Sequence, residues 1–319
     1  MEFRTRAYND FKLNTKTLSS IIKSSHETRL KGETEYYLNL PDDLKIFFPR
    51  VLSHSSNKPY KLELEYYAYD NLGNAMFTQK KQIFWQKTFD FISNYIDSYK
   101  DSANKKQNLK DLDLMYIAKT ENEYSNLINN FTEFQKLKDF DIIYLNDEPL
   151  FSFETVWIKI KEKLRSINKN DFSYLIHGDL CFSNILYGEH SHTNDLILKF
   201  IDPRGVFGET LFYGDFYYDL AKLSHSVNGG YEYFIYDNFD ISVNENKIRL
   251  NYKSANNKAL INEVFNDFVE KNNFDVEKIK LLEGCIFVGM CARHYDDINR
   301  QFAMYITGLK ILNEYYKKI

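Results

Sequence analysis

The chain has 319 residues, of which 44% are hydrophobic and 27% are charged, and its formal net charge is −4. This length supplies enough material for a buried core in one large domain or in two lobes. The apolar content excludes a disordered chain, and the slightly negative charge excludes a surface that binds nucleic acid broadly, so any charged ligand must be bound locally.

Cysteine usage and hydropathy indicate a cytoplasmic protein. The first 25 residues are too polar for a signal peptide. No apolar run approaches the roughly 20 residues that a membrane-spanning helix needs. The three cysteines, Cys181, Cys285 and Cys291, form no CxxC pair and have no zinc-binding spacing, so we expect reduced thiols and no membrane insertion.

The N-terminal part is predicted to be rich in β-strand. Its strand-like segments contain Thr, Ile and aromatic residues or alternate between polar and apolar residues, and the polar turn 10–16 separates the first two. Residues 31–40 indicate a helix that stops before Pro41. The predicted strands cover residues 3–9, 17–24 and 60–68. We expect residues 1–70 to form a small β-rich lobe.

The remaining residues, 71–319, are predicted to form a larger, mainly helical lobe. The spacing of apolar residues becomes helical after the turn DNLGN, whereas residues 100–113 are polar and indicate a loop. Two apolar runs, 173–176 and 196–201, flank the turn-rich GEHSHTND and are interpreted as the strands of a hairpin. The predicted helices cover residues 77–99, 120–137, 153–167 and 276–317. The predicted fold class is α+β, with two lobes that share a cleft.

A motif of the form HxDxxxxN follows the first of these hairpin strands. It contains His177, Asp179 and Asn184, and Asp202 comes 18 residues later, at the end of the second strand. Phosphoryl transfer needs one carboxylate to orient the attacking hydroxyl and accept its proton, and an amide oxygen and a second carboxylate to hold Mg²⁺ against the phosphates. The sequence therefore predicts Asp179 as the catalytic base and Asn184 and Asp202 as Mg²⁺ ligands. In the alternative interpretation these residues have only structural roles: His177 and Asp179 stabilise a turn, and Asp202 caps a loop.

The segment HGDLCFSNIL, followed by FIDPRG and GDFYYDLAKL, resembles the aminoglycoside phosphotransferase and choline kinase superfamily. Within it, the segment is most similar to bacterial proteins associated with capsule or surface-polysaccharide genes. The resemblance covers about residues 170–230 and implies a protein-kinase-like fold. It implies the same catalytic base and Mg²⁺ ligands as the motif. It also implies that His177 braces the catalytic loop and that Asp219 anchors this loop by hydrogen bonds.

The resemblance makes residues 1–70 the nucleotide-binding lobe and residues 71–319 the catalytic and substrate-binding lobe, and two residues of the first are candidates for the nucleotide site. Kinases need a strand lysine that contacts the phosphates and a helix glutamate that holds it. Lys23 and Glu33 match these roles, with Glu35 as a competing partner. The segment LEYY, which includes Glu65 and Tyr67, is interpreted as the connection between the lobes, where backbone groups would bind the adenine of ATP or the base of GTP.

The predicted phosphate-covering loop is unusual because no glycine precedes Gly32. Such loops normally contain glycines, which let backbone N–H groups approach the phosphates. We therefore expect either a short cover over the nucleotide or phosphate binding mainly by Lys23 and the metal. This departure lowers the expected turnover and leaves the expected fold unchanged.

Arg204, in the segment DPRG, is the first candidate for the acceptor site. Its position places a guanidinium beside the predicted metal ligands, where it would bind a phosphate or an anionic acceptor. The alternative is a structural salt bridge to an acid such as Asp215 or Asp219.

Further acceptor-binding candidates lie elsewhere in the second lobe. His294 and Asp297 are predicted to share one helix face with Gln301, which suits sugar or amino-alcohol hydroxyls, and a solvated helix face is the alternative. The resemblance alone adds Lys119. Aromatic residues make up 17% of the chain, so a cage for a quaternary ammonium group is physically feasible, although core packing accounts for most of them.

The leading functional hypothesis is a Mg²⁺-dependent kinase. It would transfer the γ-phosphoryl group of ATP or GTP to a hydroxyl of a sugar, an amino alcohol or a surface-glycan precursor. The missing glycines support an alternative, a catalytically silent nucleotide-binding module with a regulatory role. A protein kinase is disfavoured because no APE-like element follows the metal segment, and a hydrolase using Cys181 is disfavoured because no third orienting group is identified.

Overall fold

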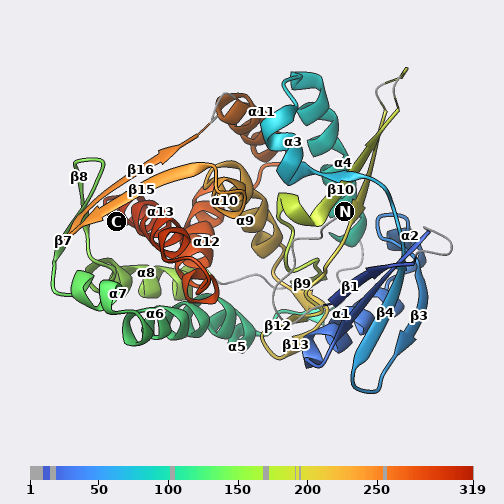
Figure 1. The fold of residues 1–319 in the computed structure, drawn as a ribbon, viewed down its shortest axis with the longest axis horizontal. Helices are drawn as coiled ribbons and strands as arrows, with labels where there is room; N and C mark the ends of the chain where they lie inside the picture. Colours follow the sequence, from blue (N-terminus) through green and yellow to red (C-terminus); the bar gives the residue numbers. More distant parts are fainter. Residues whose placement is uncertain are drawn as a thin grey trace.

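The computed structural model describes residues 10–14, 19–100, 105–167, 172–190, 192–193, 195–253 and 257–318. A β-rich N-terminal region lies at one side of the molecule, and helices from the rest of the chain form most of the other side (Figure 1). The α+β prediction is confirmed. The exact boundary near residue 70 stays a prediction.

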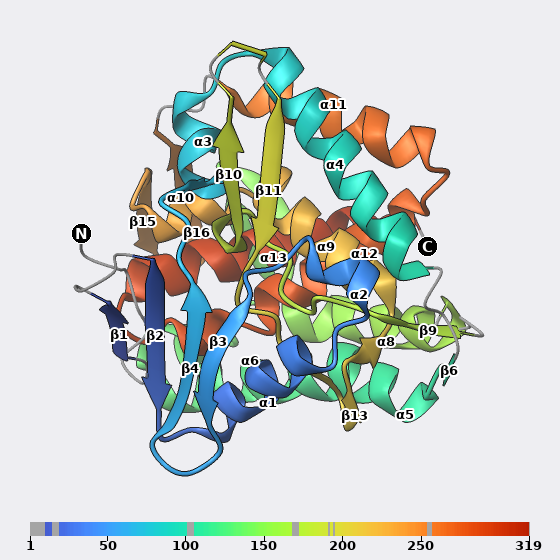
Figure 2. The ribbon, with the colours of Figure 1, turned by 90° about the vertical axis from the view of Figure 1, so that its right-hand side faces the viewer.

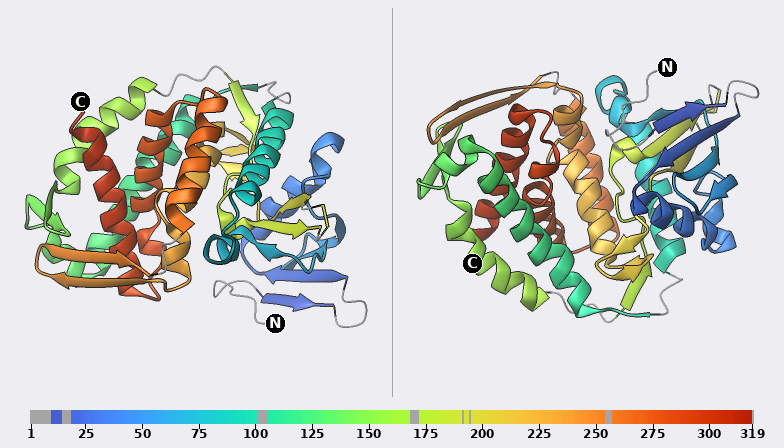
Figure 3. Two further views of the ribbon diagram at one scale, coloured as in Figure 1. Left: turned by 90° about the horizontal axis from the view of Figure 1, so that it is seen from above. Right: turned by 60° about the horizontal axis from the view of Figure 1, so that its bottom comes forward.

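The N-terminal region is a four-stranded antiparallel sheet of order β1-β2-β4-β3, and the views of Figures 2 and 3 show it at the edge of the molecule. Helix α1 connects β2 to the remaining strands, and its Tyr36 and Tyr37 are buried. The strands predicted at 17–24 and 60–68 and the helix predicted at 31–40 are thus confirmed with shifted ends. Their bounds are β1 Asp10–Leu13, β2 Ser20–Ser25, α1 Thr28–Leu38, β3 Val51–Ser55 and β4 Tyr60–Glu65.

The first turn was predicted in the wrong place, because Asp10–Leu13 forms strand β1. The residues Asp10 and Lys12 resemble turn residues by type, yet they are the exposed half of an alternating strand whose half-buried residues are Phe11 and Leu13. Residues 3–9, where the first strand was predicted, lie outside the described residues.

Helices dominate the rest of the chain. Helix α12 (Val276–Val288) packs against both α9 (Phe216–Val227) and α13 (Ile298–Tyr316). The longer ones begin and end at α3 Leu72–Thr78, α4 Gln82–Lys100, α6 Lys119–Asn130, α8 Phe153–Ile167, α9 Phe216–Val227, α11 Lys258–Lys271, α12 Val276–Val288 and α13 Ile298–Tyr316. Shorter ones are α2 Asp42–Lys45, α5 Leu109–Leu112, α7 Thr132–Leu137, α10 Tyr231–Ile235, the π-helix η1 Asp113–Ala118 and the 3₁₀ turns η2 Phe182–Asn184 and η4 Cys291–Arg293.

Short strands connect and cover these helices. One sheet has the order β11-β10-β5, a second β14-β9-β6, a third β15-β16-β7-β8, and β12 pairs with β13. Their bounds are β5 Asp70–Asn71, β6 Lys105–Lys106, β7 Ile142–Leu145, β8 Glu148–Phe151, β9 Phe172–Leu175, β10 Ile185–Glu189, β11 Leu196–Phe200, β12 Val206–Phe207, β13 Thr210–Leu211, β14 Tyr213–Gly214, β15 Phe239–Asn244 and β16 Lys247–Tyr252.

The predicted hairpin has a different first strand. β11 pairs with β10, whereas β9 pairs with β14 and β6. The HxDxxxxN motif therefore occupies the connection from β9 to β10, and the turn-rich GEHSHTND segment joins β10 to β11. The pattern of apolar residues identified the strands but could not identify the partners, because pairing is decided by contacts far apart in the sequence.

Several predicted helices also differ in extent. The helix predicted at 77–99 is two helices, α3 and α4, and the one at 120–137 is divided into α6 and α7. The predicted loop at 100–113 contains α5 at its end. The helix predicted at 276–317 is interrupted between Val288 and Ile298.

Large aromatic residues fill the core beneath the motif. Trp85 of α4 stacks on Phe182, at the end of the motif loop, with ring centroids 5.5 Å apart, and Phe48 stacks on His177 at 6.1 Å. The three cysteines are free and buried. Within the described ranges, none of the helices combines the length and the apolarity that a membrane crossing requires.

Candidate active site

Asp219, on helix α9, holds the beginning of the motif loop. Its two carboxylate oxygens accept hydrogen bonds from the backbone N–H groups of His177, at 2.8 Å, and Gly178, at 2.7 Å. The carboxylate is fully buried, and burial raises its pKa to about 7 although these two N–H donors favour the ionised form. The hydrogen bonds implied by the family resemblance are therefore present.

His177 joins the motif loop to the segment that contains Asp202. Its Nδ1 accepts a hydrogen bond from Asp179 N, which leaves the proton on Nε2, and Nε2 lies 2.9 Å from the carbonyl oxygen of Ile201. Burial lowers the pKa of His177 to about 4, so the ring is neutral. The backbone oxygen of His177 also accepts a hydrogen bond from the backbone N–H of Arg204 at 2.8 Å. The side chain braces two segments and has no free proton to exchange.

Asp179 faces two cationic side chains. Lys222 Nζ lies 2.9 Å from Asp179 Oδ1, and Arg29 Nη2 lies 3.8 Å from Oδ2. Lys222 is buried, whereas about a fifth of the Asp179 side chain is exposed. The attraction of Asp179 outweighs burial and raises the pKa of Lys222, so this lysine stays charged. The carboxylate can therefore reach a substrate while it remains held from behind.

Asn184 and Asp202 lie next to each other in the structure. Asn184 donates from Nδ2 to the carbonyl oxygen of Asp179 at 2.9 Å, so its Oδ1 is the atom it can offer to a cation. Ile201 N donates to Asn184 O at 3.0 Å, which places Asp202 next to Asn184. One amide oxygen and one carboxylate match the oxygen ligands of Mg²⁺, which takes its remaining ligands from water and phosphates. No group of three or more His, Cys, Asp or Glu side chains suited to a metal occurs in the described part of the chain.

Lys23 connects the N-terminal sheet to this site. Its Nζ lies 2.6 Å from Glu33 Oε2 and 2.5 Å from Asp202 Oδ1. Burial raises the pKa of Glu33 to about 7, against the effect of Lys23. Burial also opposes ionisation of Asp202, but the charge of Lys23 outweighs it and lowers the pKa of Asp202. The predicted lysine and its predicted partner are thus in contact, and Glu35 is not the partner.

A close backbone contact between α1 and the segment after Asp202 fixes this geometry. Gly205 has φ +73°, and a Cβ atom there would collide with the carbonyl group of Gly32. Because Glu33 follows Gly32, this contact positions the glutamate that holds Lys23.

The predicted connection between the lobes follows strand β4. The backbone N–H of Glu65 donates to Arg50 O and that of Tyr66 donates to Ser19 O, both at 2.9 Å. Both donors are already used within the protein, so a nucleotide base cannot use them. Glu65 uses its side chain to accept a hydrogen bond from Tyr67 Oη at 2.7 Å. Base binding at Tyr67 stays a prediction.

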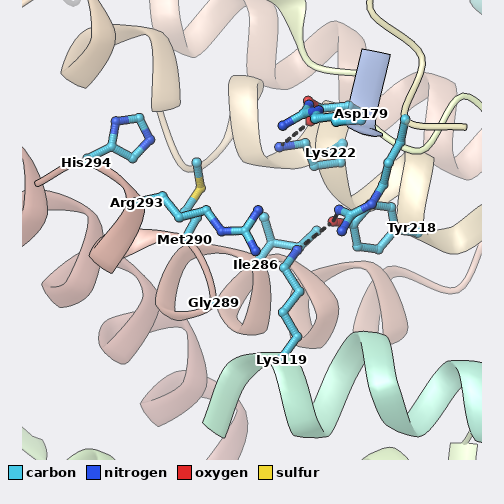
Figure 4. Close-up of a pocket in the computed structure, with 11 residues that line it drawn as sticks. Lys119, Asp179, Tyr218, Lys222, Ile286, Gly289, Met290, Arg293 and His294 are labelled. Carbon is cyan, nitrogen blue, oxygen red and sulfur yellow. Dashed lines mark hydrogen bonds and ion pairs between the residues drawn. The ribbon is translucent and has the colours of Figure 1, made fainter. Parts of the chain in front are cut away.

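A pocket opens beside Asp179, between α9, α12 and the start of α6 (Figure 4). Its walls include Lys119, Arg204 and His294, three of the four predicted acceptor-binding residues. The complete lining is Arg29, Lys119, Asp179, Arg204, Tyr218, Lys222, Ile286, Gly289, Met290, Arg293 and His294.

Arg204 and Lys119 converge on one phenol. Tyr218 Oη accepts from Lys119 Nζ at 3.2 Å and from Arg204 Nη1 at 3.4 Å. Within the described residues, Arg204 forms no salt bridge to Asp215 or Asp219, and Asp215 instead pairs with Lys278 at 2.7 Å. The structural alternative considered for Arg204 is therefore wrong.

Asp297 does not take the predicted place. It is the N-cap of α13, where its Oδ1 accepts from the backbone N–H groups of Asn299 and Arg300, and it is absent from the pocket lining found in the described residues. His294 is the C-cap that follows the 3₁₀ turn η4, so the two residues do not share a helix face. The prediction treated the segment as one helix, whereas the N-cap at Asp297 starts a new one.

Sequence reasoning missed Lys222, Tyr218, Arg29 and Arg293. A usable signal existed for two of them. Tyr218 and Lys222 are four residues apart on the helix that carries Asp219, and this spacing places side chains on one face. Arg29 and Arg293 come from distant segments and offered no such pattern.

Comparisons with known proteins identify the fold. No family model matches the chain, and no curated protein matches its sequence. A thermostable mutant of aminoglycoside phosphotransferase APH(4)-Ia, in its apo form, aligns with a TM-score of 0.56 and 10% identity over 94% of this chain and 87% of that one. A variant of that mutant, in a ternary complex with AMP-PNP and hygromycin B, aligns with a TM-score of 0.55 and 9% identity over 98% and 95% of the two chains. The fold implied by the sequence resemblance is confirmed.

Proposed function

We propose that this chain, which has the fold of the aminoglycoside phosphotransferases, transfers the γ-phosphoryl group of ATP or GTP to a hydroxyl of a small molecule in a Mg²⁺-dependent reaction. The observation that carries this proposal is the convergence of Asp179, Asn184, Asp202 and Lys23, which the loop anchored by Asp219 and braced by His177 holds together. The ternary complex of the structural neighbour with AMP-PNP and hygromycin B supports a nucleotide donor and a small acceptor.

The acceptor hydroxyl would lie at Asp179. This carboxylate is partly exposed toward the pocket, whereas Lys222 and the backbone of the motif loop hold its position. An oriented carboxylate places the attacking oxygen in line and takes its proton as the bond forms. Arg29 lies on the other carboxylate oxygen and would approach the transferred group.

The phosphates would lie between Lys23 and the motif loop. Lys23 contributes a buried positive charge, and Glu33 keeps it in place. Asn184 and Asp202 would hold Mg²⁺, which when bound neutralises charge on the phosphate oxygens. Lys23 lies on strand β2 of the sheet β1-β2-β4-β3, whose described strands contain no glycine.

A role in capsule or surface-polysaccharide synthesis belongs to the proposal as an implication of the sequence resemblance. It would make the acceptor a sugar, an amino alcohol or another glycan precursor. The alternative is a catalytically silent nucleotide-binding module, which would bind nucleotide without turnover. The following experiment distinguishes it from a kinase.

The test measures transfer from γ-labelled ATP and GTP to a panel of sugars, hydroxy acids and amino alcohols, with Mg·ATP binding followed by calorimetry. We expect Asp179→Asn to lower kcat by about 10²–10⁴-fold while Mg·ATP binding is retained. Asp202→Asn should weaken Mg²⁺-dependent nucleotide binding as well as turnover. Transfer that survives both substitutions contradicts the proposed site, and tight Mg·ATP binding without transfer to any acceptor favours the silent module.

A further inference from the structure

The pocket beside Asp179 is lined by an excess of cations. Five lining side chains are cationic, and Asp179 is the one carboxylate among the lining residues of the described chain. The cationic residues are Arg29, Lys119, Arg204, Lys222 and Arg293. A pocket of this composition favours a ligand that carries negative charge.

Three of these cations have acidic partners within the protein. Lys222 and Arg29 face Asp179 at 2.9 and 3.8 Å, and Arg293 pairs with Glu123 at 2.7 Å. These three cations share two carboxylates, those of Asp179 and Glu123, so most of their charge is balanced within the protein. They position Asp179 and the pocket wall, and they are not the groups that would choose the acceptor.

Lys119 and Arg204 differ because no carboxylate in the described chain forms a salt bridge with either. Their hydrogen bonds converge on the phenol oxygen of Tyr218, a neutral group. Both side chains are partly buried, and two cations in a partly buried pocket are costly unless an anion accompanies them. A ligand anion is the missing counter-charge.

The pKa values of Tyr218 and Lys119 support the conclusion that this part of the pocket carries an excess of positive charge. Burial by itself raises the pKa of Tyr218, but the charges of Lys119, Arg204 and Lys222 outweigh it and lower that pKa to about 8. Burial, together with Arg204 and Arg293, lowers the pKa of Lys119 to about 8 as well. An anion bound here would stabilise the charged lysine.

The two residues are also placed next to the reacting groups. Arg204 comes two residues after Asp202, and Lys119 is the first residue of α6, directly after the π-helix η1. π-Helical turns often occur at functional sites. In Figure 4, Lys119 extends from its helix toward Tyr218, and Asp179 lies at the opposite side of Tyr218 from that helix.

We infer that the acceptor is an anionic hydroxyl compound, whose phosphate or carboxylate group binds Lys119 and Arg204 while its hydroxyl reaches Asp179. This inference rests on the proposed phosphotransferase function and names its substrate class. The same pocket disfavours amine-bearing acceptors such as aminoglycosides and amino alcohols, because their charge would repel the cations. A quaternary-ammonium cage is disfavoured too, since Tyr218 and His294 are the aromatic rings among the lining residues described.

The test uses matched compounds on two skeletons. The hexose series is glucose, glucosamine, glucuronate and glucose 1-phosphate, and the second series is glycerol, 2-amino-1,3-propanediol, glycerate and glycerol 3-phosphate. Binding to the full chain with Mg·AMP-PNP is measured by calorimetry, and phosphoryl transfer is measured with γ-labelled ATP. We expect the phosphate or carboxylate member of a series to bind at least tenfold more tightly than its neutral member, and the amine member to bind most weakly.

Variants assign the effect to the two residues. Lys119→Met and Arg204→Met should each weaken binding of the anionic member roughly tenfold or more, with little change for the neutral member. Lys318→Met, which removes one charge from an exposed ion pair with Glu277, controls for net charge and should leave both unchanged.

The outcomes distinguish the inference of an anionic acceptor from the proposed phosphotransferase function. If anionic members gain nothing over neutral ones, or if amines bind as well, the inference is overturned, and transfer to a neutral or amine acceptor would then leave the proposed phosphotransferase function intact. Selective binding of anions that depends on Lys119 and Arg204 supports the inference, even if no transfer follows and the proposed function fails. The phosphate and carboxylate arms show which anion the pocket prefers.

Discussion

Lys222 Nζ lies 2.9 Å from Asp179 Oδ1 and approaches it from the buried side of the site. Because the lysine is buried and charged, it holds the carboxylate in one orientation, and its positive charge favours the ionised form of that carboxylate. The sequence motif contains only one partner of this pair.

We predict that Lys222→Met lowers kcat about 10–100-fold and changes the KM for ATP less than twofold, since the lysine positions the carboxylate that orients the acceptor. The acidic limb of the kcat profile should also move to higher pH, because Asp179 loses a charge that favours its ionised form. Steady-state kinetics between pH 5 and 9 measure both effects.

Lys278→Met is the matched control, since Lys278 is also a buried lysine that pairs with a buried aspartate, Asp215, at 2.7 Å. Loss of one partner from such a pair destabilises a protein by about 3–5 kcal/mol. Both variants should therefore lose stability, but the pH profile should shift for Lys222→Met alone. Equal shifts in both would show that Lys222 has only a structural role.

Glu33 is predicted to act through Lys23, which it contacts at 2.6 Å. Glu33→Gln removes a charge that holds the lysine near the phosphates, so the KM for ATP should rise roughly tenfold, the equivalent of about 1.4 kcal/mol. Glu35→Gln, two residues further along α1, should leave this KM unchanged. A reversed result would assign the lysine to Glu35 and contradict the observed pair.

Gly205 is predicted to be intolerant of a side chain. Gly205→Ala adds a Cβ atom that collides with the carbonyl of Gly32 at a residue with φ +73°, and such strain costs on the order of 1–3 kcal/mol. Gly32→Ala is the control from the same contact, because its Cβ would meet one atom only, at 4.0 Å, and alanine favours the helix. Urea denaturation should show a lower midpoint for the first variant and an equal or higher one for the second.

Glu283 is predicted to make stability depend on pH. It is buried on α12 and accepts a hydrogen bond from Ser224 Oγ at 2.5 Å, and burial raises its pKa from 4.5 to about 7. The folded protein therefore binds a proton more tightly than the unfolded chain. This contribution to stability is fully present below pH 4.5 and is lost as pH rises through 7.

Glu283→Gln cannot titrate, so its stability relative to the wild type should increase between pH 5 and pH 8 by about 2 kcal/mol. Chemical denaturation at several pH values measures this difference. Glu277→Gln, which removes an exposed acid from the same helix, is the control for net charge. A difference between Glu283→Gln and wild type that is constant over this range would contradict the prediction.

Sequence alone determined the local chemistry of this protein. The spacing of Asp179 and Asn184 and the flanking apolar runs were sufficient to predict a phosphate-transfer site, because a loop motif keeps its residues within a few positions of each other. Asp202 was found because it ends the second predicted strand. Lys23 and Glu33 were also found, since each lies on the predicted type of element.

Tertiary structure decided which residues complete the site. The partner of Lys23 was ambiguous until α1 was placed, and the pairing of β11 with β10 was hidden because strand partners depend on contacts between distant segments. Asp297 was assigned wrongly for a local reason, since an N-cap interrupted a pattern that looked continuous. The excess charge of Lys119 and Arg204 emerges only when six segments meet around one pocket, because a sequence shows which residues are charged but not which of them lack a counter-charge.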